Sequence, residues 1–260
     1  MTKDTQKLNS IEKAIEILLK FQEAKSHWGI RELSAELSFS PATVQRILQI
    51  LKAYDFVRQD PATRQYFIGN IFYRFLQTLN ATNSLTVLGK NFLNEVARQT
   101  KETVHLNVIE DSFRICIDHI ESPMVLKASM PVGHRSPLYA GASAKCLLAF
   151  SSQAFIDNYL AEVNLEQLTE NTITQPERLQ KELESIRSQG YAISLGERTP
   201  GLGSLSVPVF DYDGLIQASL SLAVPEVRIK QEDHLEFCIN ILVEQAGAFS
   251  KALGFKTGQF

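Results

Sequence analysis

The spacing of apolar positions in the first fifty residues predicts three helices. Apolar side chains recur at helical intervals from Ile11 to Leu19, directly after Ser10, a residue type that often caps a helix. A shorter stripe runs from Ile30 to Leu37, and a third follows Ser40 and Pro41. Proline is well tolerated at the first helical position, because the N–H that it lacks would have no helical partner there. We therefore expect one helix capped by Ser10, a short second helix, and a third capped by Ser40.

The connection between the second and third predicted helices is typical of a helix-turn-helix motif. It consists of Ser38-Phe39-Ser40. Two short β-prone runs follow at residues 56–58 and 65–68, separated by the turn cluster Asp60-Pro61-Ala62-Thr63, which predicts a β-hairpin or wing. The next apolar stripe, from Ile71 to Leu79, is too short and too apolar to be stable alone in water, so we expect it to need a partner surface.

The third predicted helix has an outward face suited to reading DNA bases. Its apolar positions between Val44 and Leu51 turn inward, which leaves small and hydrogen-bonding side chains outside. Arginine can bond guanine, and glutamine can bond adenine, through two contacts each. The helix start suits a phosphate, and the wing arginines would flank the DNA backbone. The alternative, a solvated helix on a small bundle, does not explain the turn, cap and wing together. The predicted DNA-binding residues are Ser40, Ala42, Thr43, Gln45, Arg46, Gln49, Arg58 and Arg64.

The remainder of the chain mixes strand and helix patterns, which is typical of an α+β domain. A helix is expected to begin at Pro176 and end at Gly190, and a long closing helix carries an apolar packing face from Leu235 to Leu253 that could contact a second subunit. A hairpin turn is expected at residues 211–214. Strands are expected at residues 104–108, 115–117, 191–195, 204–210 and 215–224.

Composition and charge are consistent with two domains that have different partners. The chain has 260 residues, of which 44% are hydrophobic and 21% charged, enough for one large domain or two ordinary ones. Residues 1–74 hold eleven Lys and Arg against eight Asp and Glu, whereas the remainder holds 15 against 21. No apolar run approaches the roughly 20 residues of a membrane span, and the N-terminus is polar, so a cytoplasmic protein is expected.

Several segments resemble one protein family. Residues 30–69 are similar to the winged helix-turn-helix of the IclR family of bacterial transcriptional regulators, and residues 132–148, 190–210 and 213–225 are similar to its second half. The resemblance implies an α+β regulator of double-stranded operator DNA, a homodimer through its DNA-binding domains and often a homotetramer through its effector domains. It divides the chain into a winged helix-turn-helix at 1–70, a linker helix at 71–88 and a GAF-like effector-binding domain at 89–260.

Two features of the second half suggest an effector site. A helix is expected to begin near Ala142 and Ser143, where free N–H groups and the helix dipole could hold a carboxylate. A small organic acid is therefore the expected effector. On the last predicted strand, Ser219, Ser221 and Ala223 share one face and could line a pocket, although packing on a half-exposed sheet is the alternative.

The resemblance implies a particular set of effector-binding residues. Where the last strand of the family commonly reads Ser-x-Ser-Gly-Pro, this chain has Ser221-Leu222-Ala223-Val224-Pro225, and Pro208 stands where some members have cysteine. We therefore expect a pocket less polar than one for glyoxylate or pyruvate, which favours an aromatic or longer carboxylic acid. The implied ligand-binding residues are Val125, Ala128, Ala142, Ser143, Glu197, Pro208, Ser221 and Ala223.

Other classes of function receive less support. A GAF-like-domain thiol enzyme is the main alternative, but Cys116, Cys146 and Cys238 form no CxxC pair and Cys146 lies in an apolar run. The histidines are dispersed, and the Gly201-Leu202-Gly203 segment lacks the frame of a dinucleotide site, so neither a metal nor a cofactor is predicted. A nucleic-acid module without an effector is a further alternative, which ligand-induced thermal stabilisation would test.

Overall fold

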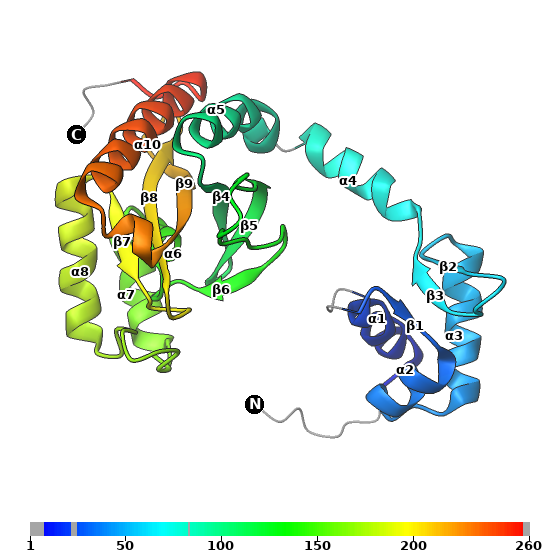
Figure 1. The fold of residues 1–260 in the computed structure, drawn as a ribbon. Helices are drawn as coiled ribbons and strands as arrows, with labels where there is room; N and C mark the ends of the chain where they lie inside the picture. The colour runs from blue at the N-terminus through cyan, green and yellow to red at the C-terminus, as the bar shows by residue number, and fades with distance from the viewer. Residues whose placement is uncertain (1–7, 22–24, 83, 257–260) are drawn as a thin grey trace. The chain divides into compact units, whose positions relative to one another are not determined.

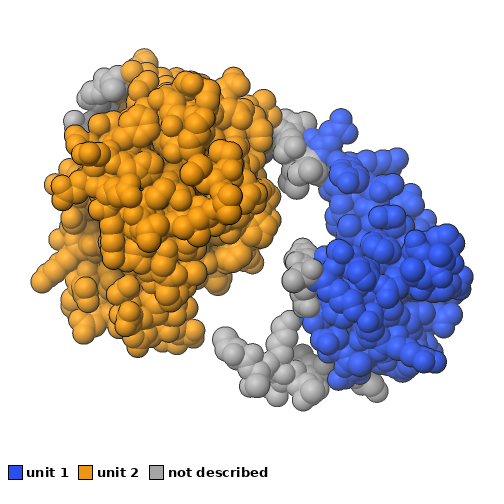
Figure 2. Space-filling view, viewed as in Figure 1, with its two compact units in different colours: residues 1–82 blue, residues 83–260 orange. Residues whose placement is uncertain are grey.

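The structure, a computed structural model, describes residues 8–21, 25–82 and 84–256. The chain divides into two units, residues 1–82 and 83–260, which are coloured separately in Figure 2. Unit 1 has its own hydrophobic core, and unit 2 has two.

Unit 1 is a winged helix-turn-helix followed by one more helix (Figure 1). The three predicted helices and the wing hairpin are confirmed. The first strand was not predicted, because two residues are too few to show a period; it pairs with the third strand to give the sheet order β1-β3-β2. The elements are α1 (Ser10–Lys20), β1 (His27–Trp28), α2 (Ile30–Leu37), α3 (Pro41–Ala53), β2 (Val57–Gln59), β3 (Tyr66–Ile68) and α4 (Ile71–Thr82).

The caps of α1 and α3 follow from local side-chain chemistry. The prediction of Ser10 as the cap of α1 is wrong: Asn9 accepts from the N–H of Glu12 at 3.0 Å, and the Glu12 carboxylate accepts from the N–H of Asn9 at 2.7 Å. This reciprocal capping box needs an acid three residues after the cap, a spacing that Asn9 has and Ser10 lacks. Ser40 and Pro41 cap and begin α3 as predicted.

The core of unit 1 fixes the orientation of α3. Val44, Ile47, Leu48 and Leu51 are all buried, as their helical spacing predicted, and they pack in one cluster with residues of α1, α2 and the sheet. Gly69 allows the chain to pass close to the end of α3, since a Cβ at this position would lie 1.8 Å from the backbone oxygen of Asp55.

Unit 2 is an antiparallel six-stranded sheet with helices on both faces, an α+β fold as predicted (Figure 1). The strand order is β6-β5-β4-β9-β8-β7, with α5 and α10 packed on one face and α6, α7 and α8 on the other. The elements are α5 (Ser84–Thr100), β4 (Thr103–Glu110), β5 (Phe113–Ile120), β6 (Arg135–Pro137), α6 (Ala142–Ala149), α7 (Gln153–Glu162), α8 (Pro176–Gln189), β7 (Ala192–Leu195), β8 (Leu202–Phe210), β9 (Ile216–Pro225), α9 (Glu226–Ile229) and α10 (Glu232–Ala252).

The predicted strands of unit 2 and the predicted start and end of α8 are confirmed. Pro176 begins α8, and Gly190 ends it in the left-handed region at φ 83°. The hairpin turn between β8 and β9 closes with the Asp211 N–H donating to the Leu215 oxygen at 3.0 Å. The closing helix α10 buries Phe249 against its own sheet, while Phe237 stays exposed. The predicted apolar face thus packs within unit 2, and the exposed Phe237 lies on another side of the helix.

Helix α5 was not predicted. The polar stretch at residues 80–86, near which the sequence predicts a domain boundary, contains the division between the two units, and most of it is helical, since α4 continues to Thr82 and α5 begins at Ser84. Leu93 and Val96 of α5 are fully buried in the same core as α10. Among the residues that the structure describes, no helix is long and apolar enough to cross a membrane.

Candidate functional site

The outer face of α3 has the side chains that the sequence predicted. Ala42, Gln45, Arg46 and Gln49 are exposed, and Thr43 is half-buried at the flank. The hydroxyl of Ser40 accepts from the N–H of Thr43 at 3.2 Å and lies 2.8 Å from the Thr43 hydroxyl. Ser40 is thus engaged in capping the helix. The arrangement leaves Gln45, Arg46 and Gln49 as the long polar side chains on this face.

The wing adds two exposed arginines next to α3. Arg58 on β2 lies over the ring of Phe67, with its guanidinium carbon 5.0 Å from the ring centre. Arg64, in the turn between β2 and β3, has a backbone oxygen that accepts from the Gln59 amide at 3.0 Å. A groove between α2, α3 and the wing brings Arg64 together with Gln45 and Gln49, which were predicted, and with Arg31 and Lys52, which were not.

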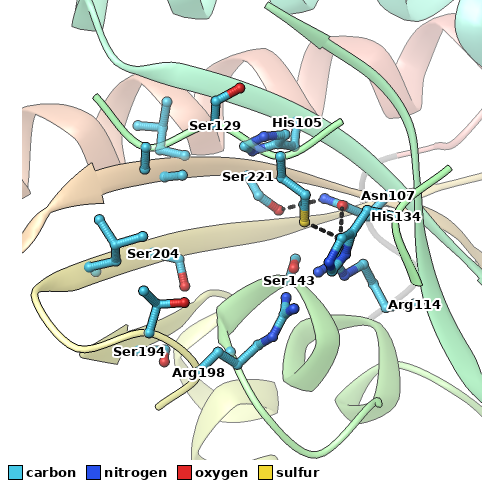
Figure 3. A pocket seen from close by; sticks show the side chains of 18 of the residues that line it. His105, Asn107, Arg114, Ser129, His134, Ser143, Ser194, Arg198, Ser204 and Ser221 are labelled. Atoms are coloured by element: carbon cyan, nitrogen blue, oxygen red, sulfur yellow. Dashed lines mark hydrogen bonds between the residues drawn. The ribbon is translucent and has the colours of Figure 1, made fainter. Parts of the chain in front are cut away.

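Unit 2 contains a cavity of about 220 Å³ between the sheet and the start of α6. Five of the eight predicted ligand-binding residues line it. Figure 3 shows Arg114, Arg198 and Ser143 pointing into this cavity from β5, the β7–β8 loop and α6. The predicted residues that line it are Ala128, Ser143, Glu197, Ser221 and Ala223, and those that the sequence missed include His105, Asn107, Arg114, Ser129, Met130, His134, Ser194, Arg198 and Ser204.

Three predicted ligand-binding residues lie elsewhere. Val125 is fully exposed, at 104% of its reference area, because the irregular segment between β5 and β6 turns it outward while Ala128 faces the cavity. Pro208 lines a separate cavity with Phe210 near the end of α10. Ala142 is completely buried behind the wall. Five of the implied residues thus share one cavity, and these three lie outside its lining.

The start of α6 is already occupied by protein groups. The N–H of Gly141 donates to Glu197 Oε2 at 2.9 Å, and the N–H of Ala142 donates to Ser204 Oγ at 3.1 Å. The N–H of Ala142, one of those predicted to be free to hold a carboxylate near Ala142 and Ser143, is therefore engaged, as is that of Gly141. Lys145 Nζ, 1% exposed, lies 2.6 Å from both Glu197 and Glu182 and fixes the Glu197 carboxylate in place.

Two guanidinium groups give the cavity a positive charge. Arg114 is 1% exposed, and its Nη1 donates to Asn107 Oδ1 at 3.2 Å and to Met130 Sδ at 2.9 Å. Burial, with the nearby charge of Arg198 second, lowers the pKa of Arg114 to about 10. Burial also lowers the pKa of Arg198. In residues 8–21, 25–82 and 84–256, neither guanidinium is paired with a carboxylate.

Apart from the two guanidinium groups and Glu197, which is paired with Lys145, the polar groups of the cavity wall are neutral. Asn107 Nδ2 donates to Ser221 Oγ at 3.2 Å, and Ser221 Oγ lies 2.7 Å from Ser206 Oγ. Burial lowers the pKa of His105 to about 3, so its imidazole is neutral at pH 7, and burial lowers the pKa of His134 as well. His105 Nε2, Arg114 Nε and His134 Nδ1 are buried with no hydrogen-bond partner among the described residues. Such orphaned groups indicate an absent polar ligand or water.

The thiols lie outside this chemistry. Cys116, Cys146 and Cys238 are buried, and burial raises their pKa values to about 11, 12 and 12. A nucleophilic cysteine needs a lowered pKa, so the geometry does not favour a thiol enzyme. Among the described residues, no group of three or more His, Cys, Asp or Glu is arranged to hold a metal ion.

A winged helix-turn-helix followed by a domain with a polar cavity defines the class of two-domain transcriptional regulators. Residues 10–61 match the IclR helix-turn-helix domain, and residues 77–251 match the C-terminal domain of bacterial transcriptional regulators of the IclR type. The chain belongs to the IclR family of transcriptional regulators.

Individual relatives cover nearly the whole chain. The HTH-type transcriptional regulator KdgR of Escherichia coli K12 is 31% identical over 259 residues, 98% of this chain and 96% of KdgR. The crystal structure of Thermotoga maritima IclR has a TM-score of 0.83 and 28% identity, covering 95% of this chain and 99% of that one. An IclR homologue from Microbacterium hydrocarbonoxydans, solved in complex with 4-hydroxybenzoate, shares the fold with a TM-score of 0.81 and 18% identity, covering 95% and 99%.

Proposed function

We propose that this regulator binds double-stranded operator DNA as a homodimer through unit 1, and that a small carboxylic acid in the unit 2 cavity sets its operator affinity. The observation that carries the effector proposal is the pair Arg114 and Arg198. Both face one small cavity, and neither has a carboxylate partner among the described residues. A buried charge without a partner is costly, and an organic anion would relieve that cost.

The polar groups of the cavity wall narrow the class of acid that could bind. The serines that line the cavity are Ser129, Ser143, Ser194, Ser204 and Ser221. Side chains of this kind bond hydroxyl and keto groups, and a volume of about 220 Å³ is smaller than a drug-sized site. These features support a short, oxygen-rich acid over the aromatic or longer acid that the last strand suggested. The 4-hydroxybenzoate of the Microbacterium homologue is also a carboxylic acid, but the likeness to that structure concerns the fold.

We assign operator contact to the α3 face and the wing. Gln45, Arg46 and Gln49 would read bases in the major groove, and Arg58 and Arg64 would contact phosphates. Ser40 would contribute through the start of α3, where Ala42 and Thr43 come close to the DNA. Arg31 and Lys52 in the same groove would add phosphate contacts. As a DNA-binding regulator, the protein would act in the cytoplasm.

The exposed apolar residues of unit 1 support the homodimer. On α1, Ile11 is 72% exposed, Ile15 51% and Leu19 46%, a stripe at intervals of four residues. Tyr73 and Phe75 of α4 are exposed as well. A contiguous apolar stripe of this kind marks an association surface, and a second copy places two recognition helices on a near-palindromic operator. The exposed Phe237 of α10 would extend the assembly to a homotetramer through unit 2.

The core contacts of α5 bear on the domain division. Leu93 of α5 is buried in the core of unit 2, so we place the start of the effector domain at Ser84 in place of residue 89. The winged helix-turn-helix is kept at residues 1–70, and α4 serves as the linker helix. Because α4 is the last element of unit 1 in chain order, it would carry the effector signal toward unit 1.

Operator titration in the presence of organic acids tests the proposed function. The experiment measures the operator Kd of the full chain with and without each of acetate, pyruvate, glycolate, gluconate and benzoate. At least one acid should change the Kd, and Arg198→Met should abolish that change while keeping effector-free operator affinity within about threefold. Arg187→Met is the matched control, because Arg187 lies outside this cavity and bonds the end of α6. An acid response that survives in Arg198→Met would contradict the assignment of the cavity.

A further inference from the structure

The segment that joins β5 to β6, residues 121–134, is here called the strap, and it has no helix or strand. Its inner side contributes Ala128, Met130 and His134 to the cavity. On its outer side, Val125 and Leu126 are exposed. The strap therefore connects the proposed effector site directly with the surface of unit 2.

Hydrogen bonds fix the strap at several points along its length. The N–H of Ser122 donates to Thr103 Oγ1 at 3.1 Å near the start of the strap, and the N–H of Gly133 donates to a β5 carbonyl at 2.7 Å near its end. Between them, Arg228 Nη2 donates to the backbone oxygen of Leu126 at 3.0 Å. The stretch from residue 127 to residue 132 lies between two of these points and carries Met130. Within it, Lys127 Nζ and Ser129 Oγ donate to the Glu121 carboxylate at 2.7 and 2.6 Å, so these two contacts would have to change with the stretch.

The contact of Met130 with Arg114 is chemically weak for a buried charge. Arg114 Nη1 donates to the Met130 thioether sulfur at 2.9 Å, one of the dashed lines in Figure 3. A thioether is a poor acceptor, whereas a carboxylate forms short, charge-assisted and often paired bonds with a guanidinium. A carboxylate in the cavity is therefore a much better partner for Arg114 than the sulfur is.

We propose that the Met130 sulfur is a placeholder for the effector carboxylate on Arg114. When an organic anion binds Arg114, it displaces the sulfur, and residues 127–132 of the strap then change conformation. This inference rests on the proposed function, since it takes the cavity to be the site of a carboxylic acid. Met130 acts as a positioning residue. Without effector its sulfur accepts from the Arg114 guanidinium, and its displacement by the effector changes the outer surface of the strap.

The placeholder role makes a quantitative claim about affinity. A contact that exists only without ligand stabilises the free state and weakens binding. Met130→Leu keeps the bulk of the side chain and removes the acceptor, so it should tighten binding of a carboxylate. A single weak hydrogen bond corresponds to a change of about two- to tenfold. Met124→Leu is the matched control, because Met124 is also on the strap but is 47% exposed and lies outside the cavity lining.

NMR spectroscopy of the methionine methyl groups tests directly whether an anion displaces Met130 from Arg114. The chain has three methionines, so protein with ¹³C-labelled methionine methyl groups gives few signals, which Met130→Leu and Met124→Leu assign. The probe is acetate, the minimal carboxylate, titrated into the full chain at constant ionic strength with chloride as the reference anion. The Met130 signal should shift saturably with acetate, and the Met124 signal should not. The absence of a saturable shift at Met130 overturns the proposal.

The affinity of acetate in the two leucine variants completes the test. This affinity is measured from the NMR signals of the Arg114 side-chain N–H groups in protein labelled with ¹⁵N-arginine. Tighter binding in Met130→Leu alone supports the placeholder, and equal affinity in both variants overturns it. If acetate moves the Arg114 signals while the Met130 methyl stays in place, the cavity still binds carboxylates and only the placeholder role is wrong. If neither signal moves and no acid alters operator affinity, the proposed function fails as well.

Discussion

Lys145 Nζ lies 2.6 Å from Glu197 Oε1 inside unit 2, and the other oxygen of Glu197 accepts from the N–H of Gly141. The same ammonium is 2.6 Å from Glu182 on α8. One buried cation thus ties the β7–β8 loop, the start of α6 and the middle of α8 together. The geometry of the cavity depends on this network, because Glu197 and Arg198 are neighbours in the chain.

Lys145→Ala should lower the free energy of unfolding by about 3–5 kcal/mol, because it leaves the buried Glu197 carboxylate without its partner. Urea denaturation of the full chain, followed by circular dichroism, measures the loss. Lys181→Ala, an exposed position on the same α8 that Lys145 contacts, should change stability by less than about 0.5 kcal/mol. Equal losses in the two variants would show that the network does not stabilise unit 2.

Arg46→Ala and Arg64→Ala should weaken operator binding in different ways. Arg46 lies on the outward face of α3, so its loss should cost about 1–3 kcal/mol and relax preference at one operator position. Arg64 lies on the wing, so its loss should weaken binding to all sequences and reduce the slope of log K against log salt by about 0.9. Titrations of operator and random DNA at several salt concentrations separate the two, and identical losses of discrimination would contradict these roles.

The neutral His105 should make unit 2 less stable in acid. Its pKa in the folded protein, about 3, lies below the usual value of 6.5, mainly through burial. The folded state therefore resists protonation, and the stability present above about pH 6.5 is lost as the pH falls toward 3, by about 1.4 kcal/mol per pH unit. Denaturation at pH 7.5 and pH 5.0 should show a loss of about 2 kcal/mol that is missing in His105→Gln. Parallel pH dependence in both proteins would rule out this contribution.

Ala223→Leu and Val125→Leu compare a wall residue with one that the structure places outside. The added methyl groups at Ala223 enter the cavity, so Ala223→Leu should abolish the effect of the acid on operator affinity while unliganded affinity stays within about threefold. Val125→Leu should leave the response unchanged, because Val125 is fully exposed. Titrations of the acid, followed by operator binding, compare the two variants. A lost response in Val125→Leu would show that Val125 belongs to the effector site.

Most helices and strands could be predicted from the sequence, because each depends on a pattern among a few neighbouring residues. The inward face of α3 followed from the spacing of Val44 and Leu51, and the end of α8 from Gly190. The missed α5 shows the limit of this approach: the mostly polar residues at 80–86 include the end of α4 at Thr82 and the start of α5 at Ser84. Whether such a stretch is a loop or a helix is decided by the tertiary core around Leu93, which no local pattern reveals.

The cavity was only partly predictable for a similar reason. The alternation along β4 places His105 and Asn107 on the polar face of a strand whose other face is apolar. In the structure both side chains are buried beside the cavity, and the register of β4 against β9 sets Asn107 opposite Ser219. Arg114 and Arg198 come from segments 84 positions apart in the numbering, so only the folded sheet brings their charges together.

The hydroxyl pair of Ser206 and Ser221, 2.7 Å apart, has a consequence for what the regulator can distinguish. Either oxygen can be the donor, so the direction of this bond can reverse by rotation of two hydroxyl groups. The wall then offers an acceptor to a ligand alcohol or a donor to a ligand ketone at nearly the same position. A hydroxy acid and the keto acid formed from it by oxidation would bind alike. On the proposed function, the protein would therefore respond to these two acids alike.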